Sequence, residues 1–125
     1  MNNYKIVLLS GDGIGPEISN VSKRLLSKLS EKYKFNFELK EELFGGIAYE
    51  QSGSPAPQDT LETCKSSDAV LLACVGDTKY DSLSRNLRPE TGLLKLRSEL
   101  NLFANIRPVK IRKSLLNAST LRQEI

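Results

Sequence analysis

The stretch KIVLLSGDGIGPE, residues Lys5–Glu17, decides the fold class of this 125-residue chain. Its first part, KIVLL, is a short continuous apolar run, which is typical of a strand buried on both faces of a parallel sheet. Ser10 and Gly11 end that run. Pro16 then suits the start of a helix, and Glu17 complements the positive helix end. The stretch therefore predicts a strand, a tight turn and a helix in direct succession.

The following residues continue the alternation of strands and helices. Apolar residues at helical spacing predict one apolar stripe on the first helix: Ile18, Val21, Leu25, Leu26 and Leu29. Phe35, Phe37 and Leu39 alternate with polar residues and predict a second strand with one wet face. A short helix over 58–66 and an apolar strand over 69–75 come next. Because this order indicates βαβ units, we predict an α/β fold with a mostly parallel sheet and flanking helices.

Glycine and proline mark the segments that we expect to be loops. Gly45-Gly46 predicts one loop, and the stretch QSGSPAP over 51–57 predicts another. Residues 76–88 predict a long polar loop without regular structure. Loops of that length inside a compact domain are uncommon and often functional.

The remaining residues predict one more helix, over 92–100, and a strand over 102–109. We expect residues 1–101 to belong to a first α/β domain and residues 102–125 to begin a second. No helix stop signal occurs before Ile125, so we expect a chain that is cut rather than finished.

Composition excludes several classes of function. The chain has no His, which removes His bases, Ser-His triads and His metal ligands. No apolar run approaches the length of a bilayer span, and the N-terminus lacks a secretory pattern, so we expect a cytoplasmic protein without membrane contact. Cys64 and Cys74 form no CxxC pair, and we expect inert thiols in a reducing compartment.

Charge is distributed unevenly along the chain. Residues 83–125 hold 9 Lys/Arg and 3 Asp/Glu, a net +6, whereas residues 1–82 carry a net −3. The basic charge of residues 83–125 is consistent with a site for an anionic ligand. The alternatives are an ordinary solvated surface and a non-enzymatic basic binding module. Phe103 is the only aromatic residue of this basic part, so it lacks the stacking platform that binds single-stranded nucleic acid, and we expect no nucleic-acid partner.

The turn Gly11–Glu17 is the first of three groups of residues that could carry chemistry. It can offer free backbone N–H groups to an anion. Its glycines follow GxGxG spacing rather than the GxGxxG of the Rossmann dinucleotide fingerprint, and a tight structural turn is the alternative.

The second and third groups of residues that could carry chemistry each contain an arginine. On a helix, Leu93, Leu94 and Arg97 share a face, which suits a ligand with a carboxylate and a branched aliphatic group. On a strand, Arg107 lies near the end where α/β proteins place ligands, and together with Arg97 it would clamp a dicarboxylate. The alternatives are core leucines with a surface Arg97, and an Arg107 that pairs with a carboxylate at the sheet edge. Asp12 and the other acids show no metal-ligand spacing.

Four segments in this order resemble the N-terminal portion of the 3-isopropylmalate dehydrogenases, within the isocitrate/isopropylmalate dehydrogenase family. They are GDGIGPE (11–17), FGG (44–46), AVLLACVGDTKYD (69–81) and RPETGLLKLRSELNLFANIRP (88–108). The resemblance covers nearly the whole chain, and its last segment is the most specific. The first segment also occurs in the isocitrate and tartrate dehydrogenase relatives.

The resemblance implies a two-domain α/β enzyme that lacks the Rossmann fingerprint, in agreement with the GxGxG spacing. The implied activity of the complete enzyme, a homodimer, is NAD-dependent oxidative decarboxylation of 3-isopropylmalate to 4-methyl-2-oxopentanoate in leucine biosynthesis, with Mg or Mn. Sister β-decarboxylating dehydrogenases acting on isocitrate or tartrate are the alternative. Leu93 and Leu94 favour an aliphatic substituent, because an extra carboxylate would need a polar partner there.

The resemblance also assigns roles to individual residues. Arg97 and Arg107 match the arginines that bind the substrate carboxylates, and Leu93 and Leu94 match the lining of the isopropyl pocket. The expected cofactor-binding residues are Ile14, Asp77, Thr78, Lys79, Tyr80, Asp81, Arg88, Pro89 and Glu90, the last close to the nicotinamide ribose.

The chain departs from the family in one motif and in its extent. The family usually reads GGPKWD where this chain reads GDTKYD over 76–81, and the added charge of Asp77 is expected to weaken binding of a pyrophosphate. The catalytic tyrosine and lysine, the third substrate arginine and the metal-binding aspartates of the family lie beyond Ile125. We therefore expect no catalytic residue and no metal ligand in this chain, and no activity from it alone. A truncated product without function is a further alternative, and the choice between NAD and NADP stays open.

Overall fold

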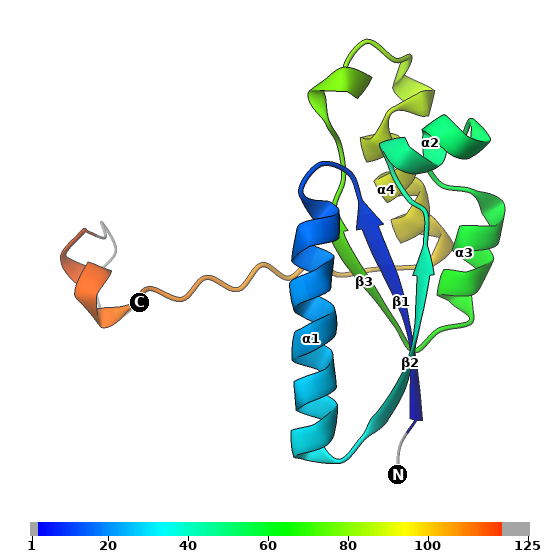
Figure 1. Cartoon of the computed structure of the whole chain (residues 1–125). Coiled ribbons are helices and arrows are strands. Elements are labelled where there is room, and N and C mark those ends of the chain that lie inside the picture. Colours follow the sequence, from blue (N-terminus) through cyan, green and yellow to red (C-terminus); the bar gives the residue numbers. More distant parts are fainter. Residues whose placement is uncertain (1–2, 119–125) are drawn as a thin grey trace.

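The structure is a computed structural model that describes residues 3–118. Within these residues, three strands and four α-helices follow one another (Figure 1): β1 Asn3–Gly11, α1 Gly15–Tyr33, β2 Asn36–Glu42, α2 Gly46–Ser52, α3 Gln58–Lys65, β3 Ala69–Cys74 and α4 Pro89–Glu99. Short 3₁₀ turns add η1 Thr78–Tyr80, η2 Arg85–Leu87 and η3 Lys113–Ala118. No helix within residues 3–118 has the length and apolar character that a membrane crossing requires.

The strands form one parallel sheet in the order β2-β1-β3. Val7 of the central strand lies opposite Lys40 of β2 and Val70 of β3. Val7, Leu8 and Leu9 are all buried, as the KIVLL run predicts for a central parallel strand. The α/β class and the parallel sheet are confirmed.

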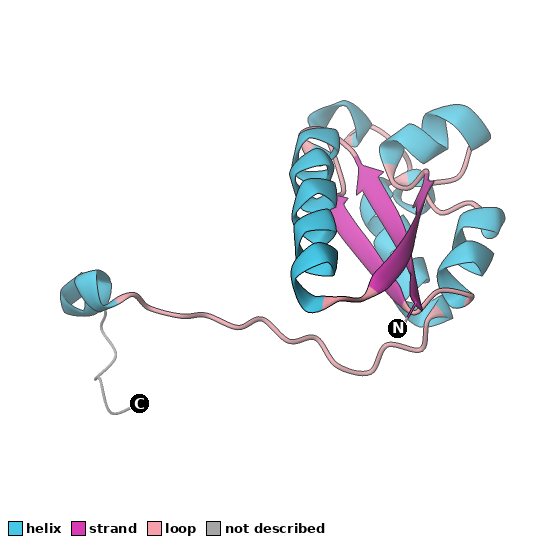
Figure 2. Ribbon diagram, turned by 60° about the horizontal axis from the view of Figure 1, so that its bottom comes forward, coloured by secondary structure: helices cyan, strands magenta, loops and turns pink. Residues whose placement is uncertain are grey.

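Helices cover both faces of the sheet (Figure 2). α1 lies on one face, and α3 and α4 lie on the other. Side chains of a strand alternate between faces, so Val7 and Leu9 enter the core beneath α3 and α4 while Leu8 points to the α1 side. The main core consists of Val7, Leu9, Phe44, Ala56, Leu61, Cys64 and Leu96.

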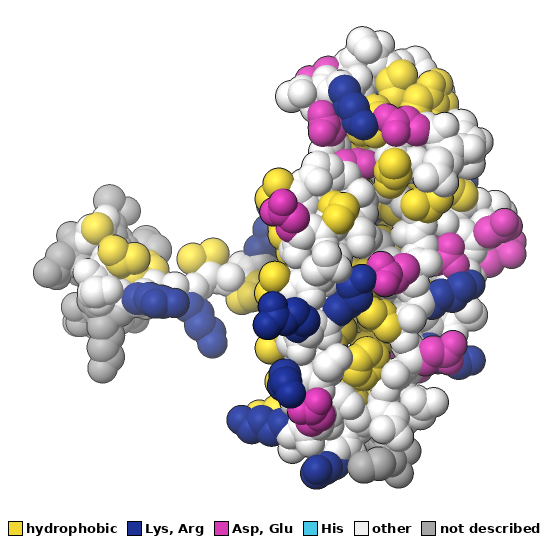
Figure 3. All heavy atoms as spheres, in the orientation of Figure 1, with side chains coloured by type: hydrophobic (Ala, Val, Ile, Leu, Met, Phe, Trp, Pro, Cys, Tyr) yellow, Lys and Arg dark blue, Asp and Glu magenta, His cyan; other side chains and the backbone are white. Residues whose placement is uncertain are grey.

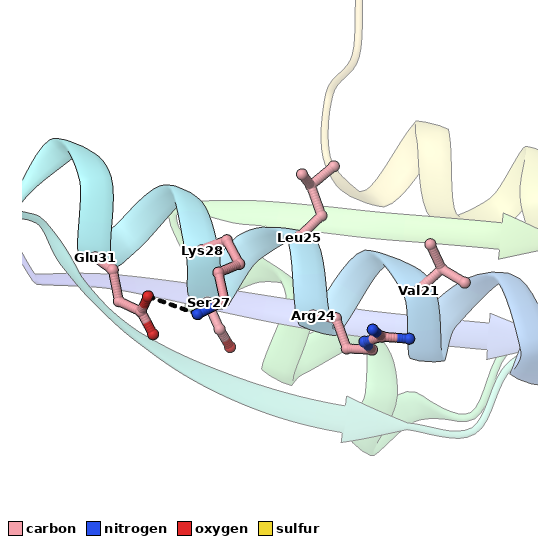
Figure 4. Close-up of a pocket in the computed structure, with 6 residues that line it drawn as sticks. All are labelled: Val21, Arg24, Leu25, Ser27, Lys28 and Glu31. Atoms are coloured by element: carbon pink, nitrogen blue, oxygen red, sulfur yellow. Dashed lines mark hydrogen bonds and ion pairs between the residues drawn. The ribbon is translucent and has the colours of Figure 1, made fainter.

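The apolar stripe predicted on α1 does not pack on the sheet as a whole. The buried residues of α1 are the small Gly15 and Ser19, which allow the helix to lie close over the strands. Val21 and Leu25 are exposed and point toward the side of β3, as Figure 4 shows. Among the described residues β3 pairs only with β1, so no further strand lies beneath that flank of α1. The hollow drawn in Figure 4 is lined by this one helix alone.

Two predicted loops contain helical turns. Gly45-Gly46 lies where a loop passes into a helix: residues 43–45 connect β2 to α2, Gly45 is the N-cap with φ +82°, and Gly46 begins α2. The segment 76–88 is not structureless, because η1 and η2 lie within it and Tyr80 is buried. α4 begins at Pro89, three residues before the predicted start, with the proline in its first turn.

The strand predicted over 102–109 is absent from the structure. These residues run out from the sheet as an extended segment (Figures 1 and 2). The segment is exposed, and the Phe103 side chain is fully so. A strand needs neighbouring backbone groups for its ladder, and within residues 3–118 this segment has none in the sheet. The proposed domain boundary near residue 101 stays a prediction.

Candidate functional site

The carboxyl ends of the three parallel strands meet at one edge of the sheet, next to α2 and η1 (Figure 1). The turn Gly11–Gly13 follows β1, Gly45-Gly46 follows β2, and Gly76 follows β3. Ligands of open α/β sheets bind outside this edge, so the three connections define the place to look for a site.

Asp12 joins these three connections through its carboxylate, which is 4% exposed. Oδ2 accepts the backbone N–H of Gly46 at 2.9 Å and that of Gly76 at 2.8 Å. Oδ1 accepts the N–H of Ile47 at 2.9 Å, and the backbone N–H of Asp12 itself donates to the Cys74 carbonyl at 3.0 Å. A buried carboxylate is tolerated because these donors satisfy it.

The glycines around Asp12 are required by space as well as by conformation. A Cβ on Gly45 would lie 2.5 Å from Asp12 Oδ2, and one on Gly76 would lie 2.6 Å from Glu90 Oε1. Both residues have positive φ, +82° and +99°. Gly46 and Ile47 are the first residues of α2, so their N–H groups have no partner within the helix and Asp12 supplies it.

Glu50 of α2 contacts two side chains of η1. Its Oε1 accepts the hydroxyl hydrogen of Tyr80 at 3.0 Å and lies 2.9 Å from Lys79 Nζ. The Lys79 ammonium also lies over the Tyr80 ring, 4.8 Å from its centroid. The hydrogen bond from Lys79 lowers the pKa of Glu50, while burial is the main cause that raises the pKa of Tyr80. The Tyr80 ring packs on Gly46, where a Cβ would lie 1.8 Å from a ring carbon.

A hollow of about 210 Å³ opens beside this cluster. It is lined by Gly11, Asp12, Gly13, Pro16, Ile47, Lys79 and Tyr80. The structure thus brings Lys79 and Tyr80, two of the residues assigned to the cofactor, against the turn that follows β1. Ile14 follows that turn and is 63% exposed, but it is not among the lining residues.

The residues next to Lys79 shape the loop. Asp77 is the N-cap of η1, and its Oδ1 accepts the backbone N–H of Lys79 at 3.1 Å and the Thr78 hydroxyl at 3.4 Å. Arg88 donates from Nε to the Leu83 carbonyl at 3.0 Å and from Nη2 to the Asp81 carbonyl at 2.6 Å. These contacts give Asp77 and Arg88 a role in holding the loop, whatever they bind.

Helix α4 presents its predicted site residues in two directions. Leu93 is half-buried and packs on the core near Leu96, whereas Leu94 is 61% exposed and Arg97 is exposed. The single shared face of Leu93, Leu94 and Arg97 is therefore divided between core and solvent, because the helix turns Leu93 and Leu96 inward together. Pro89 at the start of α4 is buried, and Glu90 next to it is exposed beside Gly76.

The two arginines predicted to bind the substrate are not brought into one hollow. Arg97 lines a hollow of about 320 Å³ with the segment 102–106. Arg107 lies on the exposed extended segment and is not among the residues that line it. A shared clamp formed by Arg97 and Arg107 stays a prediction.

Comparison with known proteins identifies the relationship. The family model described as isocitrate/isopropylmalate dehydrogenase matches residues 5–125. The chain belongs to the isocitrate/isopropylmalate dehydrogenase family. The 3-isopropylmalate dehydrogenases of Prochlorococcus marinus (strain MIT 9312) and Aquifex aeolicus (strain VF5) are 75% and 49% identical to it over all 125 residues. These residues cover 35% and 34% of the two relatives, so the chain spans about a third of their length.

The fold comparison agrees with this family. The apo crystal structure of a beta-decarboxylating dehydrogenase from Thermococcus kodakarensis superposes with a TM-score of 0.64 at 28% identity. The match covers 80% of this chain and 27% of the Thermococcus chain. Membership of the isocitrate/isopropylmalate dehydrogenase family and the α/β fold are thereby confirmed.

Sequence reasoning missed Asp12 and Glu50 in this family member. Asp12 contacts backbone groups 34 to 64 residues away, and Glu50 contacts side chains about 30 residues away, so local spacing carries no signal for either. Clustered glycines at the ends of two strands, Gly45-Gly46 and Gly76, were the one visible hint that a buried group lies nearby. Within residues 3–118 no group of three or more acidic or cysteine side chains is placed to hold a metal ion.

Proposed function

We propose that this chain forms the first third of an NAD-dependent 3-isopropylmalate dehydrogenase. The observation that carries the proposal is 75% identity, over all 125 residues, to a protein of that name. The exposed Leu94 beside Arg97 on α4 supports an aliphatic carboxylic acid as substrate, because an isocitrate side chain would place a second carboxylate near the leucine.

The hollow that Tyr80 lines supports the proposal that part of a nicotinamide dinucleotide binds there. Pro16, Ile47 and Tyr80 offer apolar surface, while the N-terminus of α1 favours negative charge. NAD, when bound, supplies the hydride acceptor. Lys79 and Tyr80 would contact it directly, and Asp77 and Arg88 would hold the loop that carries them.

The substrate side of the proposal rests on Arg97 and Arg107. A guanidinium binds a carboxylate through two parallel hydrogen bonds, which fixes the orientation of the bound acid as well as its position. Orientation of the hydroxyl-bearing carbon toward the nicotinamide is the contribution that these two residues make to the rate. Neither residue accepts or donates a proton in the reaction, because arginine stays charged at any working pH.

The described residues do not by themselves fit a divalent metal ion, since no acidic cluster is present within 3–118. We propose that acid–base and metal-binding groups come from sequence outside these 125 residues, in the homodimeric, cytoplasmic enzyme that the family resemblance implies.

A chimeric enzyme, called the joined chain from this point on, tests the proposal. These 125 residues would replace the matching residues of the Prochlorococcus marinus (strain MIT 9312) relative, and the joined chain would be assayed with 3-isopropylmalate, NAD and Mg²⁺. We expect turnover similar to that of the unmodified relative. A folded joined chain without turnover would contradict the proposal.

A further inference from the structure

One carboxylate oxygen of Glu50 holds two side chains of the hollow. It accepts the Tyr80 hydroxyl at 3.0 Å and lies 2.9 Å from the Lys79 ammonium. Both partners line the hollow, whereas Glu50 does not. Figure 3 shows acidic and basic side chains next to each other at this end of the molecule, over α2 and η1. The positive charge in the wall of the hollow is therefore already paired.

Helix α2 gives Glu50 a fixed position from which to act. Its first N–H groups, from Gly46 and Ile47, bind the buried Asp12 carboxylate. The Tyr80 ring packs on Gly46 with no room for a side chain there. α2 thus bridges the sheet edge and η1, with Asp12 at its start and Glu50 one turn further along.

We propose that Glu50 is a positioning residue for this hollow. Through one oxygen it fixes the Lys79 ammonium and the Tyr80 ring in the wall, and it neutralises the Lys79 charge beside an anionic ligand. The identity of that ligand, a nicotinamide dinucleotide, rests on the proposed function. The contact of Glu50 with Lys79 and Tyr80 does not depend on the proposed function.

Loss of the Glu50–Lys79 pair should change the affinity of the hollow for an anion. Removal of Lys79 alone leaves the Glu50 carboxylate without a cation next to the hollow, where its charge repels a pyrophosphate. Removal of both charges restores a neutral wall. The two substitutions are therefore expected to be non-additive, with the second partly reversing the first.

The first experiment uses the 125-residue chain and measures the contact directly. The Lys79 side chain lies over the Tyr80 ring, so its ε-methylene protons should resonate upfield of those of exposed lysines in an NMR spectrum. In Glu50→Gln we expect this ring-current shift to be largely lost. Glu31→Gln, which removes a carboxylate paired with Lys28 on α1, should leave it unchanged. An unaltered Lys79 shift in folded Glu50→Gln would overturn the inference.

The second experiment measures KM for NAD in the joined chain described above. Lys79→Met should raise KM for NAD about fivefold with little change in kcat, and Glu50→Gln/Lys79→Met should lower KM about twofold from that of Lys79→Met. A double variant as weak as Lys79→Met, or weaker, would overturn the neutralising role. If the unsubstituted joined chain has no turnover, the proposed function fails, while the NMR measurement still decides the contact.

Discussion

The Asp12 carboxylate lies 2.8 Å from the backbone nitrogen of Gly76 and so joins the ends of β1 and β3, 64 residues apart in the sequence. The same oxygen accepts the N–H of Gly46, which begins α2. One buried side chain therefore sets the spacing of all three strand-end connections. The hollow that the proposed cofactor would use is formed between them.

Asp12→Ala is expected to destabilise the chain strongly. It leaves one buried and two part-buried N–H groups without their acceptor, and we expect the free energy of unfolding to fall by about 3 kcal/mol. Urea unfolding followed by circular dichroism measures this. Asp59→Ala, which removes an exposed carboxylate from the first turn of α3, should cost less than about 1 kcal/mol. Equal losses in the two variants would refute the bridging role of Asp12.

Gly46→Ala is expected to displace Tyr80. The new Cβ would lie 1.8 Å from a ring carbon, so the ring must move out of the wall. We expect increased accessibility of Tyr80 in NMR and a loss of stability. Tyr80→Ala in the same chain should recover part of that loss, because it removes the collision. No recovery in the double variant would show that the two residues do not compete for space.

The two thiols are expected to differ in reactivity. Burial, with a smaller contribution from the Glu42 charge, raises the pKa of Cys64 to about 11, whereas Cys74 is only half-buried. A disulfide reagent at mildly alkaline pH should therefore label Cys74 first. Faster labelling of Cys64 in the folded chain would contradict the burial of its thiol.

The raised pKa of Cys64 also predicts a direction for stability against pH. Its protonated form is favoured in the folded chain, so this contribution is present below the ordinary thiol pKa of 9.0 and is lost as the pH rises toward 11. Cys64→Ala should flatten the fall in unfolding free energy over that range relative to the unsubstituted chain. An unchanged slope in the variant would exclude Cys64 as its source.

Arg107→Ala is expected to impair use of the substrate in the joined chain. Loss of a charged hydrogen-bonding partner for a carboxylate should lower kcat/KM about 100-fold or more. Lys110→Ala removes a nearby cation from the same exposed segment and should have little effect. Similar losses in both variants would point to general charge rather than to a specific contact by Arg107.

The 125 residues alone are expected to show no dehydrogenase activity. The described part of the chain holds no acidic cluster for a metal, and none of its residues is assigned to acid–base chemistry. An assay of the purified chain with 3-isopropylmalate, NAD and Mg²⁺ measures this. Turnover that survives further purification would contradict the expectation.

Much of the fold can be predicted from the local pattern of apolar and polar residues, because that pattern reflects which positions are buried. KIVLL becomes the central strand, and the alternation around Phe37 becomes a strand with one wet face. Patterns fail where a distant partner decides the outcome. The apolar segment 102–109 stays extended without a neighbouring strand, and α2 begins at Gly46 because Asp12 binds its first N–H groups.

The residues of the candidate site also fall into those that the sequence predicts and those that only the folded chain brings together. The family resemblance predicts Lys79 and Tyr80 as cofactor-binding residues, and both lie in the wall of one hollow. Asp12 and Glu50 were not assigned, because their partners are brought to them only by the folded chain. Spacing also placed Leu93 with Arg97, whereas packing turns Leu93 toward the core.

The most direct test of the account is the substrate preference of the joined chain. kcat/KM would be measured with 3-isopropylmalate, isocitrate and tartrate under identical NAD and Mg²⁺ conditions. We expect 3-isopropylmalate to be preferred, and Leu94→Arg to reduce this preference. A higher kcat/KM with isocitrate or tartrate would contradict it.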